Sequence, residues 1–204
     1  MAGAQRSGRL SVDLFRAFYD GRPDEEHWEL IDGVAMMMAP PTKVHQRLAH
    51  NLQRLLLNAL EHHDPSLFAY QRSGVNIAPD VDNYDPEPDV VVVDAAIHDI
   101  NERYSDRFYL AAEVVSESDR VSAQKKRDIY KLHAACKCIV TVQQERIEIR
   151  IDQRAGSGWM QTVLQRPQDI VALPDFGLRC TLADIYTGTP LLTQAAPDRQ
   201  NRSR

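Results

Sequence analysis

The sequence predicts a mixed α/β fold in which helices cover both faces of one β-sheet. Residues 90–93 and 109–115 are apolar at almost every position, which is typical of strands that are buried on both faces. Residues 43–62 instead repeat their apolar side chains at a period of about 3.6 residues, as an amphipathic helix does. Because such strands need cover on each side, we expect a layer of helices above and below the sheet.

The N-terminal part predicts a short helix followed by a β-hairpin. Ser11 is placed to cap a helix whose apolar residues follow at helical spacing. Residues 28–31 and 34–38 are apolar enough to form two strands. Asp32 and Gly33, which lie between them, are a common pair in tight turns, so the two strands should pair with each other.

The clearest helix in the chain covers residues 43–62. Thr42 can cap its first turn, and Pro65 ends it. Its apolar side chains form one broad stripe, so one side of the helix should face the core. His45 lies near the middle of this stripe, where a histidine faces either the core or the edge of a buried site.

Strands and one more helix alternate through the rest of the chain. The helix is expected over residues 118–134, with Ser118 or Asp119 at its N-cap. Besides the two apolar strands, further strands are expected over residues 67–77, 138–142, 146–151 and 159–164, the first of them interrupted at Ser73 and Gly74. We expect one domain over residues 11–192, with disordered segments at 1–10 and 193–204.

The composition is that of a globular protein and excludes several classes. The chain has 204 residues, a formal net charge of -5 and 43% hydrophobic residues. Its start lacks the apolar core of a secretory signal, and no run of about 18 apolar residues could span a membrane. Three cysteines, two of them in a strand-like run, suit buried thiols in a reducing cytoplasm. The acidic balance argues against a protein that coats nucleic acid non-specifically.

Two carboxylates interrupt the apolar strands. Asp89 opens one strand directly after Pro88, and Glu113 lies within the other. A buried carboxylate must be paired, hydrogen-bonded or metal-bound, and two on neighbouring strands repel each other unless a cation lies between them. Such oxygen ligands suit Mg²⁺. The alternatives are a structural ion pair for Glu113 and a turn role for Asp89.

Two further residues are candidates only in combination with these acids. Lys126 shares one helix face with Ser122 and Tyr130, so its ammonium reaches the acids if that face looks over the strand ends. Taken alone, Lys126 is a solvated surface lysine and His45 is a hydrogen-bonded core histidine. A zinc site is not expected, because His45 and His50 point in different directions on the helix.

Together these motifs resemble a known family. The resemblance rests on Glu29 before the Asp-Gly turn, His45, Asp89 between Pro88 and Val90, Glu113 followed by Val-Val-Ser, and Lys126 with Tyr130 four residues on. In this order they resemble the bacterial Uma-two type restriction endonucleases of the PD-(D/E)XK nuclease superfamily. The resemblance extends from about residue 10 to about residue 192.

The resemblance implies a restriction-endonuclease-like mixed sheet that carries an active site. It implies that Asp89 and Glu113 are the metal ligands, with Mg²⁺ as the ion and Mn²⁺ as its substitute. The catalytic lysine of the superfamily usually follows two residues after the acid, where this chain has Val115, and the resemblance implies that it has moved to Lys126. Catalytic roles are implied for Asp89, Glu113, Lys126, Glu29 and His45, with Glu29 as a further ligand or base.

Three functions remain open from the sequence. The first is a Mg²⁺-dependent DNA endonuclease in which water attacks the phosphodiester. The second is a catalytically inactive binding or regulatory module on the same fold, which the acidic balance favours. The third is a structural homodimer whose charges are all internal pairs and whose interface includes the methionines at residues 36–38, although these also suit a core or hairpin strand.

Overall fold

The computed structural model describes residues 9–23, 25–77, 81–100 and 102–194. The expected disordered segments at 1–10 and 193–204 therefore lie mostly outside the described residues. Within the described part, the Leu10 amide donates to the Gly33 carbonyl at 2.8 Å, and helix α5 (Pro190–Gln194) runs into the second segment. No helix of the described residues is long and apolar enough to cross a membrane.

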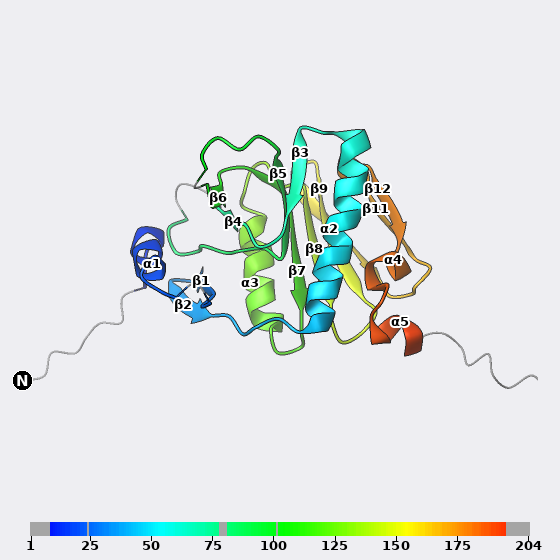
Figure 1. Ribbon diagram of the computed structural model, residues 1–204. Helices are drawn as coiled ribbons and strands as arrows, with labels where there is room; N and C mark the ends of the chain where they lie inside the picture. Colours follow the sequence, from blue (N-terminus) through cyan, green and yellow to red (C-terminus); the bar gives the residue numbers. More distant parts are fainter. Residues whose placement is uncertain (1–8, 24, 78–80, 101, 195–204) are drawn as a thin grey trace, which may run out of the picture.

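The centre of the molecule is a six-stranded mixed sheet (Figure 1). Its strand order is β10-β9-β8-β7-β5-β3, and only the β7–β8 pair is parallel. The predicted mixed α/β fold is confirmed. The strands are β3 (Leu67–Tyr70), β5 (Val90–Asp94), β7 (Phe108–Val115), β8 (Cys138–Gln143), β9 (Ile149–Ala155) and β10 (Gly158–Leu164).

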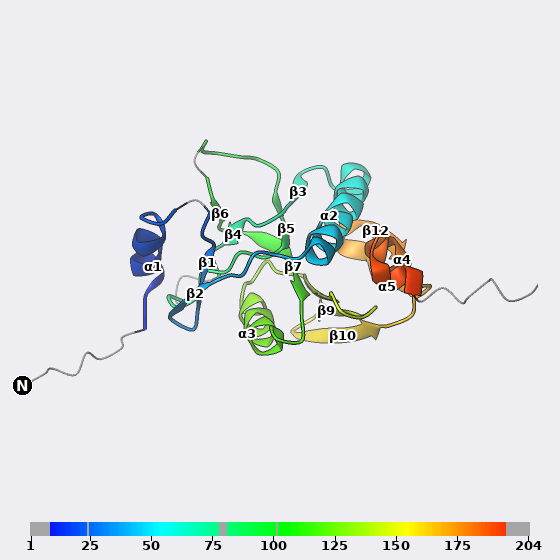
Figure 2. The same cartoon turned by 60° about the horizontal axis from the view of Figure 1, so that its bottom comes forward.

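Two helices cover opposite faces of this sheet, as Figure 2 shows. Helix α2 (Lys43–His63) begins after Thr42, whose side chain accepts from the His45 amide, and α3 (Arg120–Tyr130) covers the other face. Strand residues alternate between the two layers: Val90 and Val92 pack in the cluster under α2. Val91 and Val93 pack in the cluster that contains Tyr130 of α3. The run of valines is thus buried on both sides, as its composition predicts.

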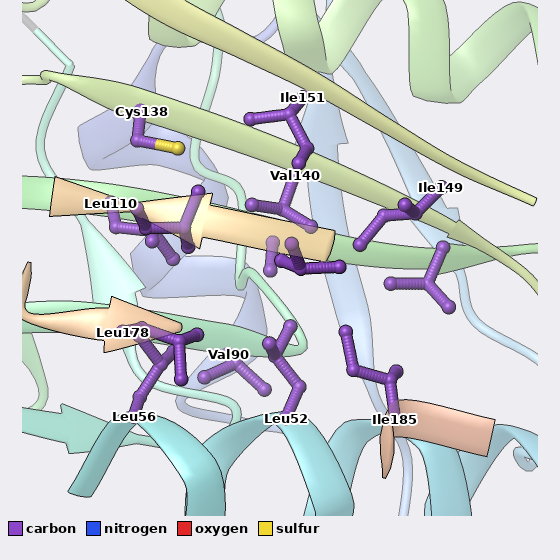
Figure 3. Packing of buried hydrophobic residues seen from close by; sticks show 14 of the residues in the cluster. Leu52, Leu56, Val90, Leu110, Cys138, Val140, Ile149, Ile151, Leu178 and Ile185 are labelled. Carbon is purple, nitrogen blue, oxygen red and sulfur yellow. The ribbon is translucent and has the colours of Figure 1, made fainter. Parts of the chain in front are cut away.

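The larger apolar cluster lies between α2 and the sheet (Figure 3). Leu52 and Leu56 of α2 contribute to it from one side, and Val140 of β8 contributes from the sheet. Each of these side chains is fully buried. Burying one such aliphatic side chain stabilises the folded state by about 1.5–3 kcal/mol, so this layer is a main source of stability.

The N-terminal elements form a separate small layer. Helix α1 (Val12–Tyr19) is capped by Ser11, and β1 (Trp28–Ile31) pairs with β2 (Val34–Met37) as predicted. Asp32 and Gly33 have φ angles of 55° and 76°, which is the left-handed conformation that a tight hairpin turn requires. The methionines at the end of β2 and directly after it are not core residues: Met36, Met37 and Met38 are 41%, 63% and 40% exposed.

Several predicted boundaries were wrong. The strand expected over residues 67–77, with an interruption at Ser73 and Gly74, is two strands in different sheets, β3 and β4 (Gly74–Val75), and β4 pairs with β6 (Tyr104–Ser105). The break lies at Arg72, whose φ of 51° turns the chain out of the main sheet. The strand expected from residue 146 begins only at Ile149, because the preceding residues form the turn from β8, and the expected helix over 118–134 stops at Tyr130.

The C-terminal elements were not predicted. They are β11 (Ile170–Leu173), the 3-10 helix η1 (Pro174–Phe176), β12 (Leu178–Thr181), α4 (Leu182–Tyr186) and α5. Buried Asn51 of α2 holds them, because its amide donates to the Ile185 and Thr187 carbonyls at 2.8 Å. A signal for α4 was present in the sequence, since Thr181 and Asp184 form a capping box.

Candidate active site

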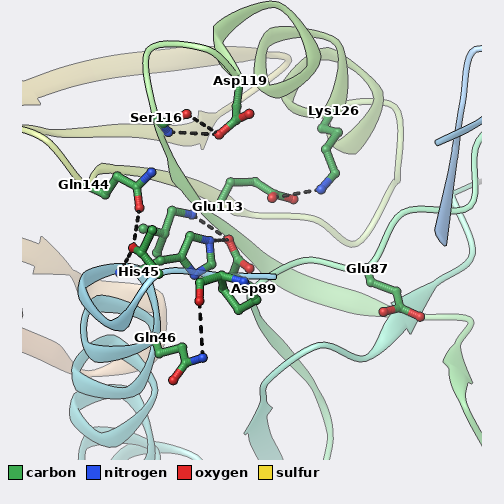
Figure 4. A network of polar contacts seen from close by, with 12 residues as sticks. His45, Gln46, Glu87, Asp89, Glu113, Ser116, Asp119, Lys126 and Gln144 are labelled. Carbon is green, nitrogen blue, oxygen red and sulfur yellow. Dashed lines mark hydrogen bonds and ion pairs between the residues drawn. The ribbon is translucent and has the colours of Figure 1, made fainter. Parts of the chain in front are cut away.

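The candidate residues Glu29, His45, Asp89, Glu113 and Lys126 all line one cleft of about 1000 Å³. They come from β1, the first turn of α2, the residue before β5, β7 and α3. Figure 4 shows His45 and Lys126 approaching the carboxylates from two sides. Side chains that are up to 97 residues apart in the sequence therefore meet in one place.

Strand pairing places the two acids side by side. In the antiparallel pair of β5 and β7, Val90 is opposite Ala112, so Asp89 falls opposite Glu113. Because side chains alternate along a strand, Glu113 lies on the same face as Ala111, which packs in the α3 cluster. The Glu113 carboxylate consequently faces α3.

Lys126 is a buried ammonium held between two buried carboxylates. Its Nζ atom lies 2.8 Å from Glu29 Oε1 and 2.9 Å from Glu113 Oε2. The three residues are only 4–7% exposed. Burial alone would lower the pKa of Lys126, but Glu113 and Glu29 together raise it above its usual range. The solvated-surface alternative for Lys126 is therefore wrong, whereas exposed Lys125 fits it.

Glu113 is fully engaged by α3. Its Oε1 atom accepts a hydrogen bond of 2.6 Å from the Tyr130 hydroxyl, and its Oε2 atom accepts from Lys126. Burial raises the pKa of Glu113 to about 7, and the charges of Asp89 and Glu29 add to the rise although Lys126 opposes it. The site thus holds more negative charge than its one lysine neutralises.

Asp89 contacts His45 of α2, the helix on the opposite face of the sheet from α3. Its Oδ2 atom accepts from the Val114 amide at 2.8 Å and lies 3.2 Å from His45 Nε2. Burial would lower the pKa of His45, but the hydrogen bond and charge of Asp89 raise it overall. His45 therefore lies at the edge of a buried site, which is one of the two positions that the sequence predicts.

One acid of the cleft was missed. Glu87 lines it, and its backbone amide donates to Glu29 Oε1 at 3.0 Å. Burial, with the charge of Glu29 next, raises the pKa of the Glu87 carboxyl to about 7. The available signal was its position between two prolines, two residues before Asp89, but only the folded chain shows that this segment is largely withdrawn from solvent.

Asp89 and Glu113 are the two carboxylates that could hold a cation together. Among the residues that the structure describes, no three His, Cys, Asp or Glu side chains form a group able to hold a metal ion. A pair still suits Mg²⁺, which binds proteins through one or two carboxylates and keeps several of its waters. The arrangement can chemically support a divalent ion beside a charged lysine.

Comparison with known proteins identifies a family for this chain and a solved structure with a similar fold. Residues 12–183 match the model of the Uma2 family, described as "Putative restriction endonuclease". The chain is also similar to a crystal structure titled a putative nuclease belonging to DUF820 from Anabaena variabilis, with 14% identity and a TM-score of 0.66. That match covers 87% of this chain and 97% of the other, and at this identity it shows the fold alone. No curated protein matches the chain.

Proposed function

Because the chain belongs to the Uma2 family, we propose that it is a nuclease that hydrolyses phosphodiester bonds in DNA with the help of a divalent metal ion. The family resemblance predicted from the sequence is confirmed by the match over residues 12–183. The observation that carries the proposal is the position of Lys126, a buried ammonium bonded to two acids beside Asp89 in an open cleft.

The donor set of the cleft fits Mg²⁺. Asp89 and Glu113 are the proposed ligands, and Mn²⁺ is the expected substitute. Glu29 and Glu87 add two more carboxylates to the cleft that holds Lys126 and His45. A bound divalent ion would offset part of their negative charge, polarise the phosphodiester and lower the pKa of a water molecule.

The remaining side chains act on the substrate or position those that do. Lys126 keeps its proton, so its ammonium can stabilise the negative charge that develops on the phosphate. Glu29 and Glu113 hold that ammonium, and Tyr130 holds Glu113. His45 orients Asp89 through its Nε2 contact. In this scheme Glu29 positions Lys126 rather than acting as a base.

The test combines cleavage with metal binding. Mg²⁺-dependent nicking of plasmid DNA should be abolished by each of three variants, Asp89→Asn, Glu113→Gln and Lys126→Met. The control is Asp128→Asn, which changes an exposed acid on α3, the helix of Lys126, and should not abolish nicking. Calorimetric titration with Mn²⁺ should show one binding event that is lost in Asp89→Asn. Full cleavage by all three site variants would contradict the proposal.

A second candidate is a catalytically inactive binding or regulatory module on the nuclease fold. The observation that favours it is that both oxygens of Glu113 already have partners, Lys126 and Tyr130, so the acid needs no metal ion to be satisfied. This candidate predicts that the wild-type protein neither binds Mn²⁺ nor cleaves DNA. The homodimer stays a prediction, which sedimentation of the wild-type protein tests.

A further inference from the structure

Three cations that line the active-site cleft have no carboxylate partner in the part of the chain that the structure describes. Lys43 and Arg47 lie in the first turns of α2, and Arg72 follows β3. All three are exposed, and none forms an ion pair with any residue that the structure describes. Arg16 and Arg166, by contrast, each pair with an aspartate.

Lys43 and Arg47 form a short basic row at the rim of the cleft. Residues four apart lie on the same side of a helix, about 6 Å apart along its axis. The row begins directly after Thr42, at the end of α2 where the free backbone amides carry partial positive charge. Both the side chains and the helix end therefore attract anions to the same rim.

Arg72 has a strained backbone. Its φ is 51°, in the left-handed region that glycine adopts freely and that bulky residues rarely adopt. Its amide is held by the Pro88 carbonyl at 3.2 Å, one residue before Asp89. Strained residues are often retained at sites where the side chain is needed.

The charge of Arg72 acts on the cleft. It opposes the effect of burial on the pKa of Glu87, and together with burial it lowers the pKa of His27. Both of these residues line the cleft. The positive charge of Arg72 therefore reaches Glu87 and His27, although no carboxylate of the described residues lies within ion-pair distance of it.

We propose that Lys43, Arg47 and Arg72 bind the phosphate backbone of the DNA strand that enters the cleft. The inference rests on the proposed function and adds the surface that holds the substrate. Carboxylates on the cleft floor repel a polyanion, so binding requires cations near them that are not already neutralised. Lys43, Arg47 and Arg72 meet that requirement.

The experiment measures DNA binding without cleavage. A short fluorescein-labelled duplex is titrated with protein in EDTA at several salt concentrations, and its anisotropy is recorded. The variants are Lys43→Ala/Arg47→Ala and Arg72→Gly. The matched control is Lys137→Ala/Arg179→Ala, which removes the same net charge from exposed residues away from the cleft. The thermal midpoint of each variant is measured alongside.

We expect the cleft variants to bind about tenfold more weakly for each cation removed, with the slope of log K against log salt reduced by about one per cation. Arg72→Gly should also melt at or above the wild-type temperature, because glycine relieves the strained φ. The control pair should bind like the wild type. This combination would separate loss of a phosphate contact from loss of folding or of net charge.

Two results would overturn the inference. If the cleft variants bind like the wild type, or if the control pair weakens binding equally, the three cations do not form the binding surface. If the wild-type protein does not bind the duplex even at low salt, the three cations do not bind DNA and the inference is wrong. The Mn²⁺ titration then tests the metal site of the proposed function separately, since it involves no DNA.

Discussion

Replacing Lys126 by methionine should destabilise the protein strongly. The change keeps an unbranched side chain, one atom shorter, but leaves Glu29 and Glu113, both less than 10% exposed, without their shared counter-ion. Removing one partner of a buried ion pair typically costs about 3–5 kcal/mol. For a domain of this size that corresponds to a fall in the melting temperature of roughly 6–20 °C.

The same substitution one residue earlier is the control. Lys125 is on the same helix, but its side chain is 47% exposed and lies 3.6 Å from Asp32. Exposed ion pairs contribute about 0–1 kcal/mol, so Lys125→Met should change the free energy of unfolding by no more than that. The difference between the two variants isolates the effect of burial.

A double variant tests whether the charge itself is responsible. Lys126→Met/Glu113→Gln removes both members of one pair, so urea unfolding should show a coupling of about 1–3 kcal/mol between the two sites. The double variant should regain stability without regaining DNA cleavage. A Lys126→Met variant as stable as Lys125→Met would refute the buried-ammonium explanation, and zero coupling would refute the pairing with Glu113.

Three further predictions concern the rest of the fold. Asn51→Ala should cost about 1–3 kcal/mol in urea unfolding and speed hydrogen exchange in α4, since it leaves two carbonyls without their donor; unchanged exchange would argue against this anchor. Tyr186→Phe should also lower the free energy of unfolding by about 1–3 kcal/mol, because its hydroxyl bonds the turn between β8 and β9; equal stability would show that water replaces it. Burial raises the pKa of Cys136 to about 12 and also raises the pKa of Cys138, so neither thiol should react with Ellman's reagent at pH 8 until the protein is denatured. Rapid reaction of more than one thiol in the native protein would contradict their burial.

The sequence predicted the elements whose signals are local. Thr42 and the apolar stripe that follows it define α2, and the valines of β5 define a strand buried on both faces. The C-terminal elements were missed because their strands are short and alternate only briefly, so their stability comes from packing on α2 and from Asn51. The sequence pattern of residues 170–186 could not indicate that Asn51, more than 130 residues from Ile185, is their hydrogen-bond partner.

The sequence by itself determined which residues could carry chemistry: a carboxylate before one apolar strand, a carboxylate inside the next, and a lysine on the helix after it. Only the tertiary structure decided their state. It placed Glu29 of the N-terminal hairpin against Lys126, made Glu87 a half-buried acid, and left Lys43, Arg47 and Arg72 at the rim without an ion-pair partner among the described residues. The reason is physical, because the energy of a charge depends on its burial and on neighbours that the fold brings from distant parts of the chain.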